Sequence, residues 1–137
     1  MPESLISSVP QLKVFASFDC ERDEKLFKRL LAEGTSPDAK FTVFDRSTRG
    51  VLSQEAMNGL CDRISQVDVV LVLCGQWTHR SANVNAEVEV AKELGKRYYL
   101  LKGRRLFDCG RPSSARIDDK MYKWTPGVVN QLVIRNI

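Results

Sequence analysis

Glu87 places a carboxylate where an amphipathic helix would normally carry an apolar side chain. The segment from 81 to 95 is typical of one helix, and its apolar residues recur at helical spacing: Val84, Val88, Ala91 and Leu94. Glu87 follows Val84 by three residues, so we expect its side chain to lie beside that inward stripe. A carboxylate there costs stability unless it is paired or faces a cleft. The pattern leaves two interpretations open: a rim glutamate whose head group reaches solvent, or a functional charge.

The elements that would position Glu87 alternate between strands and helices. We predict strands over 13–18, 41–44, 68–73 and 97–101, and helices over 21–33, from Ser53 onward and over 81–95. Residues 128–134 could form a helix or a short strand, and we favour the helix. The run 68–73 is apolar on both faces, which is typical of a central parallel strand, and 103–125 is expected to be largely irregular. This order predicts an α/β fold with a flavodoxin-like, doubly wound, mainly parallel sheet. The sheet would belong to one domain over 13–137, after a short lead-in of residues 1–12.

Polar residues stand at the carboxyl ends of three predicted strands, where doubly wound sheets bind ligands. Together with the start of the Glu87 helix, these ends supply the candidate substrate-binding residues: Phe18, Asp19, Asp45, Ser47, Gly75, Thr78 and Asn83. Thr78 and Asn83 lie near that helix start, where backbone amides could receive phosphate oxygens. The predicted strand-end loops therefore converge on Glu87.

Structural roles are also open for several of these candidates. Phe18 could end a core strand, and Asp19 could cap a helix. Asp45 and Ser47 could form a turn, and capping alone would explain Asn83. The residue types by themselves do not separate these roles from substrate binding.

The net charge of +4 is mild for a chain of 137 residues. Basic residues cluster at 96–97 and 102–105, but no aromatic-basic interleaving or recognition-helix pattern accompanies them. We therefore prefer a solvated face, with contact to a small phosphorylated ligand as the second interpretation, and predict no nucleic-acid partner. No apolar run is long enough to cross a membrane, and the first residues lack the features of a secretory signal.

The cysteines show no close pairing, and His79 is the single histidine; the cysteines are Cys20, Cys61, Cys74 and Cys109. Zinc sites usually have paired ligands at short spacing, so we predict no metal site. Cys61 and Cys74 fall within apolar patterns and are expected to be buried thiols. These features predict a reduced, cytoplasmic protein.

Several segments, taken in order, resemble the TIR-like family. They are Val14–Asp19, then Asp68–Gly75 with Thr78, then Val84–Glu87 through Ala91 to Gly95–Lys96. The chain is most similar to the bacterial branch that includes the NAD-consuming TIR subunit of Thoeris antiphage systems. Residues 111–115 and 119–125 also look like that branch. The resemblance covers nearly the whole chain from Lys13 onward.

The resemblance implies an activity and a role for Glu87. In this family a helix glutamate serves NAD cleavage, and by its position in the motif that residue is Glu87 here. NAD would be the substrate, with no bound cofactor, and an NAD nucleosidase or ADP-ribosyl cyclase would release nicotinamide from it. The product would be ADP-ribose or a cyclic ADP-ribose-type signal that a separate effector protein reads. The resemblance also implies self-association into a homo-oligomer.

The chain departs from the pattern of better-known TIR domains in one place. Those domains often have Trp-Cys just before the glutamate helix, where this chain has Ala82-Asn83-Val84. The TIR-like branch varies at this point, so the difference is neutral for catalysis. It removes support for nicotinamide stacking at that position.

A single carboxylate suits the implied reaction. Nicotinamide leaves the ribose as a neutral molecule and needs no general acid, whereas ordinary glycosidases employ two carboxylates. One ionised carboxylate in a partly dry cleft can stabilise the oxocarbenium-like charge that develops on the ribose. Cyclisation further requires a pocket that folds NAD, so that an adenine nitrogen or a ribose hydroxyl reaches the anomeric carbon while water is kept out.

Other functions also occur on flavodoxin-like folds. A non-catalytic assembly or scaffold module stays open, because TIR folds often act as homotypic assembly domains. A response-regulator receiver is disfavoured, because Cys74 and Gly75 follow the strand 68–73 in place of a phosphoacceptor aspartate. A flavin carrier is disfavoured, because the loop after the first strand lacks a Ser/Thr-Gly-rich phosphate cradle.

Overall fold

The computed structural model describes residues 11–50, 52–103 and 108–135. Its strands are β1 (Leu12–Ser17), β2 (Phe41–Arg46), β3 (Val69–Cys74), β4 (Arg97–Lys102) and β5 (Met121–Lys123). Its α-helices are α2 (Glu24–Gly34), α3 (Gln54–Ser65), α4 (Ala82–Glu93) and α5 (Val128–Val133). A short lead-in was predicted for residues 1–12, and residues 1–10 of it lie outside the described residues. None of the described helices is long and apolar enough to cross a membrane.

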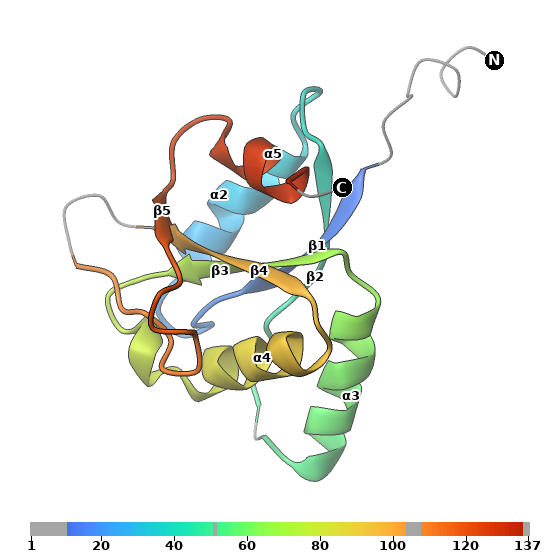
Figure 1. Cartoon of the computed structure of the whole chain (residues 1–137), viewed down its shortest axis with the longest axis vertical. Coiled ribbons are helices and arrows are strands. Elements are labelled where there is room, and N and C mark those ends of the chain that lie inside the picture. Colours follow the sequence, from blue (N-terminus) through green and yellow to red (C-terminus); the bar gives the residue numbers. More distant parts are fainter. Residues whose placement is uncertain (1–10, 51, 104–107, 136–137) are drawn as a thin grey trace.

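The five strands form one parallel sheet in the order β2-β1-β3-β4-β5. Helices α2 and α5 cover one face of the sheet, and α3 and α4 cover the other (Figure 1). The predicted flavodoxin-like, doubly wound fold is therefore confirmed. The chain runs outward in both directions from β1 and β3, so the topological switch point, where such sheets bind ligands, lies between these two strands.

Strand β3 is buried along its whole length, and its alternate residues face the two helix layers. Leu71 and Leu73 pack in a hydrophobic cluster with residues of α2 and α5. Val70 and Val72 pack in a second cluster with residues of α3 and α4. The apolar run of this strand predicted a central position, and β3 does lie between β1 and β4.

Strand β2 contains one extra residue relative to β1. Val14 of β1 pairs with Val43 of β2. The next residue of β1, Phe15, pairs with Asp45, so Phe44 is left without a partner on β1. The strand therefore continues to Arg46, beyond the end predicted at residue 44.

This bulge determines the face of the sheet to which the side chains at the end of β2 point. Because side chains alternate along a strand, one extra residue transfers all later side chains to the opposite face. Before the bulge, Phe41 packs in the cluster beside α2 and α5. After it, Asp45 forms an ion pair with Arg63 of α3, on the other face. Ser47, two residues further on, is directed to the same face as Asp45.

The turn after β1 delays the first helix. That helix was predicted from residue 21, but α2 begins at Glu24 with Asp23 at the N-cap position. The amides of Arg22 and Asp23 donate to the Asp19 carbonyl oxygen at 3.2 and 2.8 Å, so residues 19–23 form a turn of their own. The capping role considered for Asp19 is therefore wrong.

A short strand interrupts the region that was predicted to be largely irregular. Residues Met121–Lys123 form β5, which pairs in parallel with the end of β4. Three residues are too few to show the alternation by which strands are recognised in a sequence. The helix predicted over 128–134 is confirmed as α5.

Leu94 does not belong to the inward stripe of the Glu87 helix. Helix α4 ends at Glu93, and Gly95 follows with a φ of 69° in the left-handed region. The chain therefore turns away before Leu94 can face the sheet, and the side chain is 41% exposed. Val90 is buried in the second cluster instead.

The same substitution at two leucines tests this boundary. Leu100→Ala, in β4 where the leucine is 1% exposed, should lower the free energy of unfolding by about 2–5 kcal/mol, because it leaves a cavity. Leu94→Ala should cost less than about 1 kcal/mol, because little buried area is lost. Urea denaturation of both variants measures the difference. Equal losses would contradict the assignment of Leu94 to the surface.

Candidate functional site

Glu87 is a buried residue of α4. The Ser81 hydroxyl caps the helix by accepting a hydrogen bond from the Val84 amide at 3.4 Å. Val84 and Val88 are buried against the sheet, and the side chain of Glu87 lies among them with only 3% of the residue exposed. The interpretation of Glu87 as a rim residue with its head group in solvent is therefore wrong.

Two serine hydroxyls hold the Glu87 carboxylate. The Ser17 hydroxyl donates to Oε1 at 2.6 Å, and the Ser47 hydroxyl donates to the same oxygen at 2.5 Å. The Ser47 hydroxyl oxygen also accepts from the Phe18 amide at 3.0 Å, and Glu87 is a nearer acceptor for its proton than the Ala16 carbonyl oxygen at 3.4 Å. The ends of β1 and β2 thus meet α4 at a single carboxylate oxygen.

Ser17 was not among the predicted site residues. The prediction took Phe18 and Asp19 from the end of β1, but the α3/α4 face receives Phe15 and therefore also Ser17, two residues later. Strict alternation from a correctly placed Phe15 would have indicated Ser17. The sequence had no signal for the face of Ser47, because that face depends on the bulge in β2.

Burial raises the pKa of Glu87 from 4.5 to about 7. The hydrogen bonds from Ser17 and Ser47, the side chain of Asn83 and the positive charge of Arg63 act in the opposite direction. Desolvation is the largest of these effects, because the carboxylate has lost almost all contact with water. Both the protonated and the ionised forms of Glu87 are therefore populated near neutral pH.

Asn83 joins the start of α4 to the end of β1. Its amide nitrogen donates to the Phe18 carbonyl oxygen at 3.1 Å, and its Oδ1 accepts from the Ser81 hydroxyl at 2.9 Å. Ser81 is the N-cap, so capping does not explain Asn83. Asn83 lies one helical turn before Glu87, on the side of the carboxyl edge of the sheet.

Gly75 and Thr78 shape the loop after β3. The Gly75 amide donates to the Thr78 hydroxyl at 2.7 Å, and the Gly75 carbonyl oxygen accepts from the Gly110 amide at 2.8 Å. A Cβ atom on Gly75 would overlap both carboxylate oxygens of Asp23, so a larger residue would require the Asp23 side chain to move. Thr78 is fully buried. Both residues have structural roles in this conformation, and substrate contact stays a prediction for them.

Phe18 lies on the face of the sheet opposite to Glu87. Its ring is fully buried and stacks on Phe27 of α2, with centroids 5.0 Å apart and planes 11° apart. The guanidinium of Arg46 lies over both rings. The side chain therefore packs in the core, which is the structural role that was considered for Phe18 beside substrate binding.

Asp45 is engaged by an arginine of α3. Arg63 donates to both of its carboxylate oxygens, at 2.8 and 2.9 Å, and also to the Arg46 carbonyl oxygen. The hydrogen bonds from Arg63 hold the pKa of Asp45 below its usual value. Asp45 thereby fixes Arg63, whose positive charge acts on Glu87, and its own contact with substrate stays a prediction.

A cleft of about 280 Å³ opens at the carboxyl edge of the sheet. It is bounded by the loop after β1, the loop after β2 and the start of α4. Its lining residues are Asp19, Cys20, Glu21, Arg22, Thr48, Arg49, Gly50, Leu52, Arg80, Ser81, Ala82 and Asn83. Two of the predicted site residues, Asp19 and Asn83, therefore share this cleft. Glu87 does not line this cleft and lies about one helical turn after Asn83 on α4.

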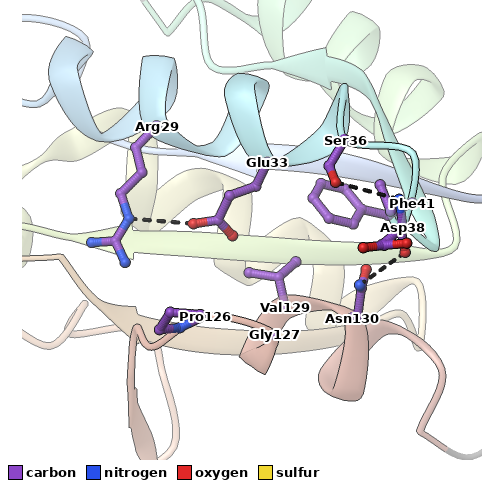
Figure 2. Close-up of a pocket in the computed structure, with 10 residues that line it drawn as sticks. Arg29, Glu33, Ser36, Asp38, Phe41, Pro126, Gly127, Val129 and Asn130 are labelled. Atoms are coloured by element: carbon purple, nitrogen blue, oxygen red, sulfur yellow. Dashed lines mark hydrogen bonds and ion pairs between the residues drawn. The ribbon is translucent and has the colours of Figure 1, made fainter.

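A second cavity, of about 330 Å³, lies between α2 and α5 on the other face of the sheet (Figure 2). The Arg29–Glu33 ion pair stands at one end, and Asn130 donates to the Asp38 carbonyl oxygen at the other (Figure 2). None of the predicted site residues lines this cavity.

The cysteines of the described residues are free, and Cys74 is buried whereas Cys61 is only partly buried. The expectation of a buried Cys61 is therefore only partly met. Over the described ranges, no group of three or more His, Cys, Asp or Glu side chains is arranged to hold a metal ion.

The raised pKa of Glu87 predicts how stability depends on pH. A group that binds its proton more tightly in the folded state stabilises the protein below its unfolded pKa, and this stabilisation is lost as the pH rises through the folded pKa. Between pH 4.5 and 8, Glu87 should therefore lower the free energy of unfolding by roughly 3 kcal/mol. Glu87→Gln should remove this loss, because glutamine cannot ionise.

Urea denaturation of the wild type and of Glu87→Gln at pH 5 and pH 8 checks this expectation. The stability of the variant relative to the wild type should increase with pH. Glu93→Gln, on the exposed side of the same helix, is the control and should keep the pH dependence of the wild type. A difference between Glu87→Gln and wild type that is the same at both pH values would contradict the burial of an ionisable Glu87.

A family model described as Thoeris protein ThsB, TIR-like domain, matches residues 15–102 of the chain. The match runs from β1 to the end of β4 and includes Glu87 with both of its serine partners. None of the curated proteins matches the chain. The family match covers more than half of the sequence and confirms the resemblance seen in the ordered motifs. The chain belongs to the TIR-like domain family of the Thoeris protein ThsB, and is thus a TIR-type module of an antiphage defence system.

Proposed function

We propose that this protein cleaves NAD at the bond between nicotinamide and ribose, with Glu87 as the catalytic carboxylate. The observation that supports this most is the placement of one glutamate, held by Ser17 and Ser47, about one helical turn after Asn83, which lines a cleft at the carboxyl edge of the sheet. This edge is where doubly wound sheets bind nucleotides. Membership of the TIR-like family supports the choice of NAD.

In the proposed step, the bond between the ribose anomeric carbon and the pyridine nitrogen breaks. The electron pair leaves with the nitrogen, so the cationic nicotinamide group departs as neutral nicotinamide. A water oxygen, or a nitrogen or hydroxyl of the same NAD molecule, bonds to the anomeric carbon. Its proton passes to Glu87 or to solvent. The products are nicotinamide with ADP-ribose in the first case and with a cyclic ADP-ribose-type molecule in the second.

The environment of Glu87 fits this role. In its ionised form, a carboxylate with little water around it stabilises the positive charge of the ribose more strongly than it would in water. A pKa of about 7 leaves the ionised form populated at neutral pH and also allows Glu87 to accept a proton from the nucleophile. The two serines keep the charge in place before the substrate arrives.

Substrate must still reach the buried carboxylate. Ser17 and Ser47 donate hydroxyl hydrogen bonds to Oε1, and the hydroxyls of a ribose could donate bonds of the same kind. We propose that the ribose enters from the Asn83 side and exchanges hydrogen bonds with these serines. The loop after β2 and the start of α4 would have to separate slightly, since the cleft of about 280 Å³ is at the small end for ligand sites.

The proposal extends to the biological setting. The nucleotide product would be a signal made during phage infection and read by a separate effector protein, and the protein would act as a homo-oligomer. We propose no nucleic-acid, membrane or metal partner and no cofactor besides the substrate NAD.

The direct test is to incubate the purified protein with NAD, alone and in lysate of infected cells, and to identify the products by mass. We expect release of nicotinamide, with ADP-ribose or a cyclic isomer as the second product. Glu87→Gln should lower the rate by roughly 100-fold or more, because the charge that stabilises the ribose cation is lost. Glu93→Gln, which removes a carboxylate from the exposed side of α4, should retain the wild-type rate.

Unchanged nicotinamide release by Glu87→Gln would remove Glu87 from the mechanism. The burial of Glu87 also suits a purely structural carboxylate in a non-catalytic scaffold module. Concentration-dependent self-association without NAD turnover under any of these conditions would favour that alternative.

A further inference from the structure

We infer that Arg49 and Arg80 bind the diphosphate of the dinucleotide in the cleft near Glu87. This inference rests on the proposed function and assigns the part of the substrate that the cleft itself would hold. Neither residue was among the predicted site residues.

The charged side chains around the cleft come from separate loops. Arg22 follows β1, Arg49 follows β2, and Arg80 precedes α4; the acids that line the same cleft are Asp19 and Glu21. Arg22 and Asp19 neutralise each other, because their side chains form an ion pair at 3.0 Å. Two guanidinium groups and one carboxylate are then left at the cleft, and this net positive charge favours the binding of an anion.

Arg49 and Arg80 have donors to spare. Arg49 donates one bond, from Nη2 to the Cys20 carbonyl oxygen at 3.0 Å. The Arg80 guanidinium lies over the ring of Trp77, 4.8 Å from its centroid. Among the residues that the structure describes, neither arginine has a carboxylate within ion-pair distance. A guanidinium has five N–H donors in a planar fork that matches phosphate oxygens.

The other arginines near this edge are already engaged. Arg46 forms an ion pair with Glu24 at 3.0 Å, and Arg63 forms one with Asp45 at 2.8 Å. These ion pairs occupy both guanidinium groups, and the charge of Arg63 also acts on Glu87. Arg49 and Arg80 are therefore the two that remain for a ligand in this cleft.

The spacing suits a dinucleotide whose ribose is at Glu87. Asn83 lines the cleft, and Glu87 is four residues later on α4, which corresponds to about 6 Å along the helix axis. In NAD only the ribose ring and its CH₂–O group separate the anomeric carbon from the first phosphate, which is a comparable reach. A ribose placed on Glu87 would thus put the diphosphate in the cleft between the two arginines.

Binding to the full chain tests the inference without turnover. ADP-ribose and adenosine are titrated by calorimetry into three proteins. These are Glu87→Gln alone, Glu87→Gln combined with Arg49→Gln, and Glu87→Gln combined with Arg80→Gln. Each arginine variant should weaken ADP-ribose binding about tenfold and leave adenosine binding unchanged, because only ADP-ribose carries the diphosphate. Arg116→Gln removes an exposed arginine outside the cleft and should change neither affinity. Inorganic pyrophosphate should displace ADP-ribose from the wild-type protein, which tests the site without any arginine variant.

The outcomes separate this inference from the proposed function. Unchanged ADP-ribose affinity and unchanged KM for NAD in both arginine variants, with turnover still lost in Glu87→Gln, would overturn the arginine site alone. Arginine-dependent ADP-ribose binding by a protein that never cleaves NAD would overturn the proposed function and keep the diphosphate site. Loss of adenosine binding in the arginine variants, or failure of pyrophosphate to compete, would also overturn the inference.

Discussion

Burying a carboxylate between a helix and a sheet costs free energy unless neighbouring groups form hydrogen bonds to it. In this protein Ser17 and Ser47 form those hydrogen bonds to Glu87. Each partner comes from a different element: α4 carries the carboxylate, β1 ends at one serine, and the chain leaving β2 supplies the other. The three elements must therefore be positioned to within a hydrogen-bond length of one another. The parallel sheet, with its central β3 buried on both faces, holds the three elements in these positions.

The bulge in β2 connects this contact to the rest of the edge. By adding one residue, it directs Asp45 and Ser47 to the face on which α3 and α4 lie. Asp45 then fixes Arg63, whose charge favours the ionised form of Glu87, while Ser47 bonds to Glu87 directly. The same loop continues to Arg49 at the cleft. One backbone irregularity thus positions two of the groups that favour the ionised form of Glu87, and also one wall of the cleft at this edge.

Local patterns were sufficient to predict the strands β1 to β4, the helices and the special status of Glu87, because burial imposes periodicity on long elements. They could not reveal the bulge, since Phe44 is a normal strand residue and only pairing with β1 shows it to be extra. The sequence therefore did not show the face to which Ser47 points, whereas Ser17, in place of Phe18, followed from strict alternation after Phe15. Asp19 and Leu94 were misplaced because a turn and a helix end, which depend on specific backbone bonds, interrupt the regular pattern.

The most direct test is a pH titration of the Glu87 side-chain carboxyl carbon by NMR, with Glu87→Gln used to assign the resonance. A midpoint near pH 7 is expected in the wild type, and Ser47→Ala should move it higher, because that serine stabilises the ionised form. A midpoint near 4.5 in the folded protein would contradict the account, because it would show that Glu87 is in contact with water and is not the buried carboxylate on which the proposed site depends.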